Sequence, residues 1–547
     1  MENKTIARIF EEIADFLEIK QENAFKIRSY RNAARIIENF PRRIEEFVKE
    51  GGDLTSIQGI GEAISKKIKE ILETGDCSLH RRLVAEMPYS LLKLLKVPNL
   101  GPRTVGQLYS QYGIQTLDQL REFLSSPRAL EVSGLGKKKI EKILKGLERI
   151  KIYLGKFTVE EVEEALSIVK HEIPEAEPVG SYRRWDELFS DLDLLINPRE
   201  LKFPWPERKE EGKRTFFFPA GVPVDFFART KRGIWLLLLT GPPSHIEFLK
   251  RRAEKLGARL TENGLFYKGK FYYESEEEIY SLLGMDYIPP QLRHYENLEK
   301  PPKLIEEKHL LGDLHVHTDW SDGKETLEGV VQKAEELGYE YIGISDHSQS
   351  SRIANGLTPE RLLAQIEKAK EVEKSRGIKV FIGSEVDILE DGRLDFPDLI
   401  LSKLDYVIAS IHFKQELGKD DMTNRILTAL ENPFVNILGH PTARLLGKRP
   451  PIEVNWDEVF KKAAEKKVAI EINCQPDRLD LPFWLAERAK KYDLYFVINT
   501  DAHCGHSIKS LRRYGIQVAK KAAIPPERII NTWEWERVEK FFKKELS

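Results

Sequence analysis

Two aspartates occupy alternate positions of an apolar run, Asp191-Leu192-Asp193-Leu194-Leu195-Ile196. Side chains two apart in a strand project from the same face, so we expect both carboxylates side by side in front of a leucine-rich layer. Close carboxylates repel each other unless a cation lies between them, and Mg²⁺ binds such oxygens together with substrate phosphates. The run therefore predicts metal-dependent phosphate chemistry, although Asp-x-Asp alone is also typical of a polar strand end.

A turn that suits phosphates precedes this pair. Gly180-Ser181-Tyr182-Arg183-Arg184 supplies backbone N–H groups, the Ser181 hydroxyl and the Arg184 guanidinium, all of which can hold a polyphosphate. Together the two stretches resemble the nucleotidyltransferase palm of the family X DNA polymerases. The resemblance implies that Gly180, Ser181 and Arg184 bind the nucleotide.

The same resemblance implies a third carboxylate on a neighbouring strand. Asp225 interrupts the apolar residues 222–227 in the right order along the chain, and its alternative role is that of a strand-edge aspartate. With Asp191 and Asp193 it would hold two Mg²⁺ or Mn²⁺ ions for in-line attack on the α-phosphate of a dNTP.

Several positions depart from the family pattern. Leu238 and Leu239 stand where an aromatic residue usually monitors the nucleotide sugar, Pro242 follows the Thr-Gly pair, and Ser190 replaces a frequent glycine. These departures put the selection of the nucleotide sugar and the polymerisation rate in question, while the three acids are all present. One alternative is therefore a phosphoesterase whose polymerase-like front end only binds DNA, and another is a non-catalytic DNA-binding scaffold.

A second centre is indicated by the histidines, eight of which, out of twelve, follow residue 300. Seven apolar runs there alternate with helical segments, which predicts parallel strands in a distorted (βα)7 barrel. The runs are 310–317, 339–347, 379–388, 406–412, 435–440, 468–474 and 494–503. Imidazoles and carboxylates stand towards their carboxyl ends, where barrel sites gather. One such histidine would be an ordinary core residue, but six at the ends of five strands indicate a metal site suited to Zn, Mn or Fe.

Gly312-Asp313-Leu314-His315-Val316-His317-Thr318, with Ser345-Asp346-His347, resembles the PHP (polymerase and histidinol phosphatase) domain. The resemblance implies three divalent metals, Mn²⁺ and/or Zn²⁺, that activate water for attack on a phosphodiester. The implied ligands are His315, His317 and Asp501 for the first metal, His412 and His440 for the second with Glu385 between the two, and Asp322, His347 and His503 for the third. Arg444 is either a phosphate ligand or a solvated surface arginine.

The first 150 residues are predicted to be almost entirely helical, because apolar residues recur at helical spacing from Ile6 onward. Three turns, Gly59-Ile60-Gly61, Asn99-Leu100-Gly101 and Gly134-Leu135-Gly136, each precede a helix. A left-handed first residue followed by a helix N-terminus presents N–H groups to a phosphate. One turn alone would only close a tight loop, but all three resemble helix-hairpin-helix motifs, which bind the DNA backbone without reading sequence.

The resemblance assigns DNA contacts to the five glycines of these turns and to Lys67, which follows the first turn. Lys67 either contacts a 5′ phosphate or, as in some family X enzymes, forms a Schiff base with an abasic sugar.

The 547 residues, 41% hydrophobic and 32% charged, predict a globular chain of several domains. We expect an N-terminal lyase-like helical domain (1–85), a fingers-like helical domain (86–150), a palm (151–235), a thumb (236–300) and a PHP domain (308–547). The net charge of −2 combines +5 in residues 1–150, from 26 Lys+Arg against 21 Asp+Glu, with −7 in the remainder. Three cysteines without regular spacing and no long apolar run predict a cytoplasmic protein.

The order and lengths of these predicted domains thus resemble, over nearly the whole chain, those of the bacterial-type family X polymerases that carry a C-terminal PHP domain. The implied fold is an all-α helix-hairpin-helix region, an α+β nucleotidyltransferase palm and thumb, and a distorted (βα)7 PHP barrel. The implied activity is gap-filling DNA synthesis in repair with a Mn²⁺-dependent 3′→5′ exonuclease, carried out by a monomer on gapped or primer-template DNA with dNTPs.

Overall fold

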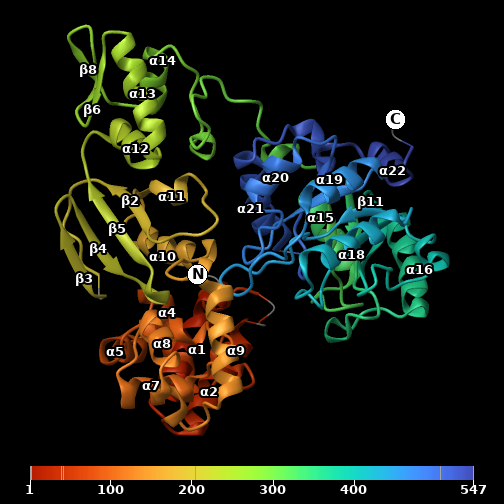
Figure 1. The fold of residues 1–547 in the computed structure, drawn as a ribbon, viewed down its shortest axis with the longest axis horizontal. Coiled ribbons are helices and arrows are strands. Elements are labelled where there is room, and N and C mark those ends of the chain that lie inside the picture. Colours follow the sequence, from red (N-terminus) through yellow and green to blue (C-terminus); the bar gives the residue numbers. More distant parts are fainter. Residues whose placement is uncertain (1–2, 39, 41, 204, 506, 546–547) are drawn as a thin grey trace. The chain divides into compact units, whose positions relative to one another are not determined.

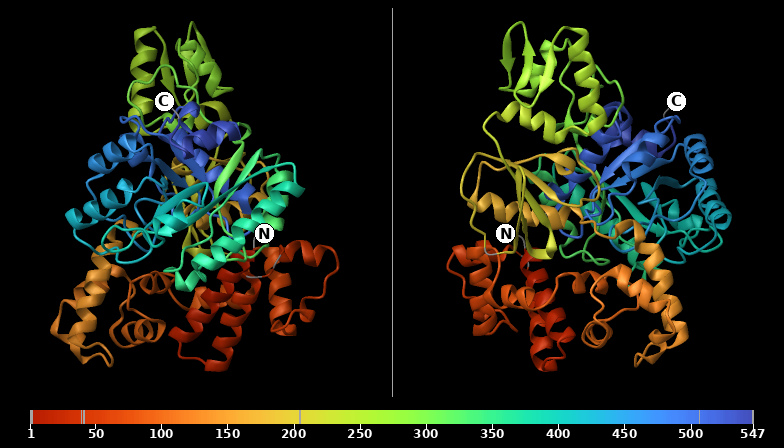
Figure 2. Two further views of the ribbon diagram at one scale, coloured as in Figure 1. Left: turned by 90° about the vertical axis from the view of Figure 1, so that its right-hand side faces the viewer. Right: turned by 60° about the vertical axis from the view of Figure 1, so that its left-hand side comes forward.

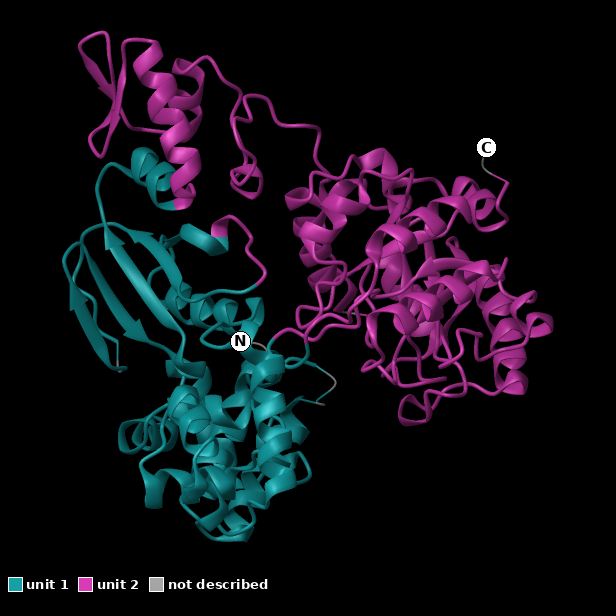
Figure 3. Ribbon diagram, in the orientation of Figure 1, with its two compact units in different colours: residues 1–182, 188–239, 447–449 teal, residues 183–187, 240–446, 450–547 magenta. Residues whose placement is uncertain are grey.

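The computed structural model describes residues 3–38, 40, 42–203, 205–505 and 507–545. The chain divides into two compact units: residues 1–182, 188–239 and 447–449 form unit 1, and residues 183–187, 240–446 and 450–547 form unit 2 (Figure 3). None of the helices within the described ranges is long and apolar enough to cross a membrane. The finer division into five domains stays a prediction.

The N-terminal part of unit 1 is helical, as predicted, and it forms the red-to-orange helices of Figures 1 and 2. Its helices are α1 (Asn3–Ile19), α2 (Ala24–Glu38), α3 (Ile44–Lys49), α4 (Glu62–Thr74), α5 (Ser78–Glu86), α6 (Ser90–Leu95), α7 (Pro102–Tyr112), α8 (Leu117–Leu124) and α9 (Lys137–Ile150). Helix α1 buries the apolar positions that predicted it, among them Ile6, Phe10 and Ile13.

The three predicted turns have the expected backbone. Gly59, Asn99 and Gly134 are left-handed, with φ of 94°, 68° and 80°. The second glycine of each turn is the extended N-cap residue of α4, α7 or α9, and no side chain caps these three helix starts. The first N–H groups of α4 and α9, and those of α7 that follow Pro102, are therefore left for an outside acceptor such as a phosphate.

A buried charged cluster joins elements of unit 1. The His80 imidazole, 1% exposed, lies 2.9 Å from a carboxylate oxygen of Asp76 through Nδ1 and 2.9 Å from one of Glu12 through Nε2. Burial alone would lower the pKa of His80, but the hydrogen bonds to both acids outweigh it and raise the pKa to about 10. The Trp205 indole N–H also donates to Asp76, at 3.3 Å. The imidazolium thus links α1 and α5, and Asp76 extends the cluster to the segment that contains Trp205.

We expect this cluster to stabilise unit 1 less as the pH rises. The folded-state pKa of His80 lies above the unfolded value of 6.5, so the contribution is complete below pH 6.5 and is lost as the pH rises through about 10. Its full size is on the order of 5 kcal/mol. His80→Gln keeps a polar group that cannot ionise. The difference in melting temperature between wild type and His80→Gln should shrink from about pH 6 to about pH 10, and a constant difference would contradict the assignment.

The palm region of unit 1 contains a five-stranded sheet in the order β1-β2-β5-β4-β3, in which β2 and β5 are parallel and the other neighbours antiparallel. The strands are β1 (Glu177–Pro178), β2 (Leu192–Ile196), β3 (Glu207–Glu210), β4 (Lys213–Phe217) and β5 (Pro223–Ala228), and the helices are α10 (Val159–Glu172), α11 (Gly180–Arg183) and α12 (Arg232–Thr240). Leu192, Leu194 and Ile196 are fully buried, so the predicted leucine-rich layer lies behind the aspartates.

Residues 240–300, in unit 2, combine helices with a small antiparallel sheet. The elements are α13 (Pro243–Lys255), β6 (Arg259–Thr261), β7 (Gly264–Tyr267), β8 (Lys270–Tyr272) and α14 (Glu276–Leu282).

The rest of unit 2 is the predicted barrel, with seven parallel strands paired in chain order. They are β9 (Gly312–Val316), β10 (Tyr341–Ile344), β11 (Lys379–Asp387), β12 (Tyr406–Ser410), β13 (Val435–Leu438), β14 (Ala469–Asn473) and β15 (Phe496–Asn499). The helices are α15 (Leu327–Glu336), α16 (Pro359–Ser375), α17 (Asp398–Leu401), α18 (Lys419–Glu431), α19 (Trp456–Glu465), α20 (Phe483–Ala489), α21 (Ser507–Lys521) and α22 (Trp535–Phe542). The His317 N–H donates to the Ala502 carbonyl at 2.9 Å, which nearly closes the barrel between β9 and the end of β15. The predicted distorted (βα)7 fold is confirmed.

The two ends of the barrel differ in chemistry. At the amino ends of the strands, Tyr341 and Tyr406 belong to an apolar cluster with Phe541 and Phe542 of α22, and the rings of Tyr406 and Phe542 stack at 4.8 Å. This end is closed by aromatic packing. The polar side chains inside the barrel therefore lie at the opposite end, at the carboxyl ends of the strands.

Candidate metal centres of the palm and the barrel

The three predicted acids of the palm meet at one point. Asp193 on β2 pairs directly with Asp225 on β5, and Asp191 immediately precedes β2. One carboxylate oxygen from each lies within 4.8 Å of the other two. Burial, and then the negative charge of Asp225, raise the pKa of Asp191. A divalent cation would relieve the crowding of charge, so the donor set fits a hard metal ion.

Two side chains of β4 that sequence reasoning missed hold Asp225. Lys213 Nζ donates to Oδ2, and Thr215 Oγ1 donates to Oδ1 at 2.5 Å. Burial would lower the pKa of Lys213, but the hydrogen bond and charge of Asp225 raise it. Lys213 and Thr215 are two residues apart on a strand next to β5. Only the pairing of the two strands identifies them as partners of Asp225.

The predicted nucleotide-binding turn lies partly against the acids. Gly180 has a φ of 61°, and a Cβ at this position would overlap the Asp193 carboxylate, which explains the glycine. Ser181 follows it, half-buried, in α11. The Arg184 guanidinium donates to the Thr240 carbonyl and to Asp186, at 2.9 Å each. A nucleotide would therefore have to compete for Arg184.

The predicted DNA-contacting residues occupy the helix starts described above. Gly59 also packs closely, because a Cβ there would meet the end of the Ile36 side chain, which would have to shift. Lys67 is the sixth residue of α4 and is half-buried, with Nζ 3.3 Å from the Ala63 carbonyl and 6.0 Å from the centre of the Tyr30 ring.

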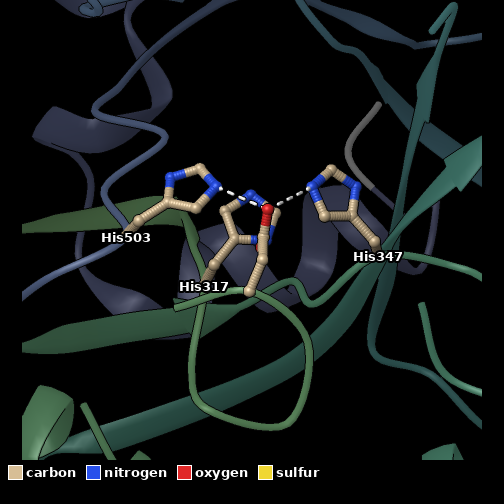
Figure 4. A group of neighbouring side chains, drawn as sticks. His317, His347 and His503 are labelled. Carbon is tan, nitrogen blue, oxygen red and sulfur yellow. Dashed lines mark ion pairs between the residues drawn. The ribbon is translucent and has the colours of Figure 1, made fainter. Parts of the chain in front are cut away.

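All nine predicted barrel ligands converge at the carboxyl ends of the strands. Three groups, each with one ligand atom per residue within 4.8 Å of the others, are His317, Asp322, His347 and His503; His315, His317 and Asp501; and His347, Glu385 and His412. His440 joins them through Nε2, which lies 2.7 Å from Glu385 Oε1. Figure 4 shows the rings of His317, His347 and His503 turned towards one another.

The cluster is open on one side. His315 and His317 are 0% exposed and Glu385 is 1% exposed, whereas the side chains of Asp322 and His503 are 31% and 35% exposed. Their Oδ2 and Nε2 atoms lie 3.2 Å apart. Water and a substrate would therefore approach at Asp322 and His503.

The charges of the cluster are strongly coupled. Burial would raise the pKa of Glu385, but the imidazoles of His412 and His315 hold it well below its usual value. Burial would lower the pKa of His412, but Glu385 and Asp387 raise it to about 10. Burial, followed by the neighbouring rings of His347 and His503, lowers the pKa of His317 to about 4. Protons and divalent cations balance the same carboxylates, so metal binding would release protons.

Unpaired buried atoms test whether metal ions fit. Among the described residues, His315 Nε2, His317 Nδ1 and Glu385 Oε2 are buried without a hydrogen-bond partner. Buried polar atoms are rarely left without partners, and a cation would supply one to each. Because the donors are imidazole nitrogens and carboxylate oxygens, the cluster is chemically suited to transition-metal ions.

Two buried carboxylates that sequence reasoning missed lie behind the ligands. Glu471 on β14 accepts from His315 Nδ1 at 2.7 Å and from the His440 N–H at 2.6 Å. Asp387 on β11 accepts from His412 Nδ1 at 2.6 Å. Nε2 of each ring then faces Glu385, at 3.4 Å for His315 and 3.1 Å for His412. A carboxylate on the far nitrogen fixes the ring and tautomer of a metal-binding histidine.

We expect Asp387→Ala to weaken metal binding by the barrel by about 10- to 100-fold, because His412 loses the group that orients it. Asp387→Asn keeps a hydrogen-bond acceptor without the charge and should lose less. Calorimetric titration of the chelator-treated full chain with Mn²⁺ measures the affinity, and Asp391→Asn, at an exposed turn, is the matched control. Equal affinities in wild type and Asp387→Ala would show that His412 needs no such support.

Arg444 fits neither predicted role. It is 3% exposed, so it is not a solvated surface arginine. Its guanidinium pairs with Glu187 at 2.8 Å and donates to the carbonyls of Arg478 and Leu479. With its donors held inside the protein, Arg444 is not a phosphate ligand.

Four parts of the chain match known families. Residues 1–77 match the helix-hairpin-helix domain, residues 91–149 the SAM-like helix-hairpin-helix tandem, residues 235–294 the DNA polymerase beta thumb, and residues 313–475 the PHP domain. These matches agree with the helical region, the thumb and the barrel predicted from the sequence.

Curated relatives extend the match. The DNA polymerase/3′-5′ exonuclease PolX of Bacillus subtilis (strain 168) is 33% identical over 577 aligned positions, which cover all of both chains. Probable phosphatases of Thermoanaerobacter sp. (strain X514) and Clostridium acetobutylicum are 30% and 31% identical, covering 41% and 42% of this chain and 91% and 92% of their own. The full-length match shows the family: the chain belongs to the family X DNA polymerases that carry a C-terminal PHP domain.

Proposed function

We propose that the protein fills short gaps in DNA during repair and that its barrel removes nucleotides from 3′ ends by metal-dependent hydrolysis. The observation that carries the proposal is the presence of two separate ligand sets, three acids in the palm and nine residues in the barrel, where His440 joins the eight others through Glu385. The name of the B. subtilis relative, which pairs a polymerase with a 3′-5′ exonuclease, supports the same pairing.

In the palm, Asp191, Asp193 and Asp225 would hold two Mg²⁺ or Mn²⁺ ions. Bound ions supply charge neutralisation for the attacking and leaving oxygens of an in-line displacement. Lys213 and Thr215 keep Asp225 in place, and Gly180 and Ser181 contact the nucleotide phosphates, joined by Arg184 once it leaves Thr240. The primer 3′ hydroxyl gives its proton to a carboxylate of this set as its oxygen bonds to the α-phosphorus of a dNTP. The bond from that phosphorus to the α,β-bridging oxygen breaks, and pyrophosphate leaves.

In the barrel, the nine clustered residues would hold three ions, Mn²⁺ and/or Zn²⁺. Bound ions supply Lewis acidity, which lowers the pKa of water and offsets phosphate charge. Asp322 and His503 border the open side, where a 3′ end can enter. Hydrolysis breaks the bond between phosphorus and the 3′ oxygen of the penultimate nucleotide, whose oxygen takes a proton, and a nucleoside 5′-monophosphate is released.

The three helix-hairpin-helix turns would hold the backbone of gapped DNA through uncapped N–H groups, with Lys67 as a phosphate contact on α4. Binding of this kind is independent of sequence, which suits repair of arbitrary sites. We propose that the enzyme acts as a monomer in the cytoplasm.

The experiment incubates the full chain with a duplex that carries a one-nucleotide gap. With dNTPs and Mg²⁺ or Mn²⁺ the primer should lengthen by one residue, and with Mn²⁺ alone its 3′ end should shorten. Shortening without any extension would reject the polymerase and leave a phosphoesterase with a DNA-binding front end. Extension without shortening would reject the exonuclease.

A further inference from the structure

Arg478, in the loop after β14, brings a guanidinium to the barrel cluster: its Nε lies 3.8 Å from Asp501 Oδ2, and its side chain is 19% exposed. We propose that Arg478 binds the scissile phosphodiester at the barrel metal centre by donating to its non-bridging oxygens. The proposal rests on the hydrolytic function proposed above and adds a substrate-binding residue to it.

The pairing with Asp501 leaves the guanidinium available. A charge-assisted hydrogen bond measures about 2.7–2.9 Å, so 3.8 Å is a loose contact. Asp501 has closer partners, because His317 Nε2 lies 3.1 Å from Oδ1 and Asn473 Nδ2 donates to Oδ2 at 3.0 Å. Within the described ranges, no group accepts a hydrogen bond from the Arg478 side chain.

Arg444 holds the backbone that carries this guanidinium. Its Nε donates to the Arg478 carbonyl at 2.7 Å, and another of its nitrogens pairs with Glu187 at 2.8 Å. Both side chains of the pair are nearly buried, at 4% and 11% exposed. A buried ion pair adds little net stability compared with apolar packing, so its evident effect here is to fix the loop.

Gln475 ties the start of the same loop to the end of β15. Its Nε2 donates to the backbone carbonyls of Thr500 at 3.1 Å and Asp501 at 2.7 Å. The loop is thus attached both to Arg444 and to the segment that carries a metal ligand. Arg478 is held beside the cluster while its side chain stays partly exposed.

The chemistry of the ligand follows from this placement. Metal ions bound at the cluster would neutralise Asp501, which frees the neighbouring guanidinium from the carboxylate that it faces in the described part of the chain. A phosphodiester gains negative charge on its non-bridging oxygens during attack, and a planar guanidinium matches two of those oxygens at once. Lysine can supply the charge but not the paired geometry.

The test uses the metal-loaded full chain with Arg478→Ala and Arg478→Lys, and Arg393→Ala as a matched control at an exposed turn. The probe is thymidine 5′-monophosphate, the product of hydrolysis at a 3′ thymidine, titrated calorimetrically. We expect Arg478→Ala to weaken its binding by about tenfold or more, since hydrogen bonds between charged groups are lost. Arg478→Lys should recover part of the affinity, while metal content and DNA synthesis stay at wild-type levels.

Wild-type affinity for the monophosphate in Arg478→Ala would overturn the proposal. So would loss of bound metal with unchanged monophosphate affinity, which would make Arg478 a counter-ion of Asp501. If the wild-type chain did not shorten 3′ ends at all, the proposed hydrolytic function would fail instead, because monophosphate binding is measured without turnover.

Discussion

Asp193→Ala is expected to abolish DNA synthesis while 3′-end shortening continues at the wild-type rate. Asp193 on β2 pairs with Asp225 on β5 and contributes one of the three carboxylates of the palm set. Without it the remaining two acids cannot position both cations, and the loss of several kcal/mol of transition-state stabilisation should lower kcat by about a thousandfold or more. Single-nucleotide incorporation on a gapped duplex measures this effect.

Asp193→Asn provides a second, nearly isosteric variant, and it should lose synthesis as well because the charge is removed. Glu200→Ala, at an exposed acid of the palm region, should behave as wild type. Loss of both activities in a folded Asp193 variant would refute the assignment of two independent centres.

Glu385→Ala is expected to give the opposite result, with 3′-end shortening lost and synthesis retained. Glu385 lies 2.7 Å from His440 Nε2, 3.1 Å from His412 Nε2 and 3.4 Å from His315 Nε2, so it is the acid shared by most of the barrel ligands. Its removal leaves buried imidazoles without the bridging charge. We expect bound metal to fall together with a loss of hydrolysis of about a thousandfold or more.

Elemental analysis of the purified variant measures bound metal, and digestion of a 3′-labelled strand with Mn²⁺ measures hydrolysis. Glu385→Gln preserves the volume of the side chain in case the alanine variant does not fold, and Glu390→Ala alters an exposed acid shortly after β11. Retention of hydrolysis by a folded, metal-depleted Glu385→Gln would mean that the barrel cluster is not the nuclease.

Sequence reasoning succeeded where the functional side chains follow the local repeat of a strand or helix. Alternation along β2 placed Asp191 and Asp193 on one side, and histidines at strand ends predicted a single barrel cluster. Asn99 is expected to be left-handed because it takes the first position of the second turn and asparagine tolerates that conformation, and its φ is 68°.

Supporting residues escaped sequence reasoning because their partners are far away along the chain. Glu471 contacts His315 across 156 residues, so no local pattern connects them. One local signal did exist. Glu471 is a lone acid inside the apolar run of β14, the strand that contributes no predicted ligand. Lys213 could be identified only once the pairing of β4 with β5 was known. Arg444 was misinterpreted since nothing near it in sequence indicates Glu187 as its partner.

The short segment Arg183-Arg184-Trp185-Asp186-Glu187 belongs to the same compact unit as the barrel. Besides the Glu187–Arg444 pair, Lys521 Nζ lies 2.6 Å from Asp186 and donates to the Arg184 carbonyl at 3.0 Å. A nuclease fragment excised at residue 308 would lack Glu187 and so lose the nearly buried ion pair with Arg444, at a cost of about 3–5 kcal/mol. An autonomous version would therefore need an apolar side chain at position 444 or a transplanted carboxylate.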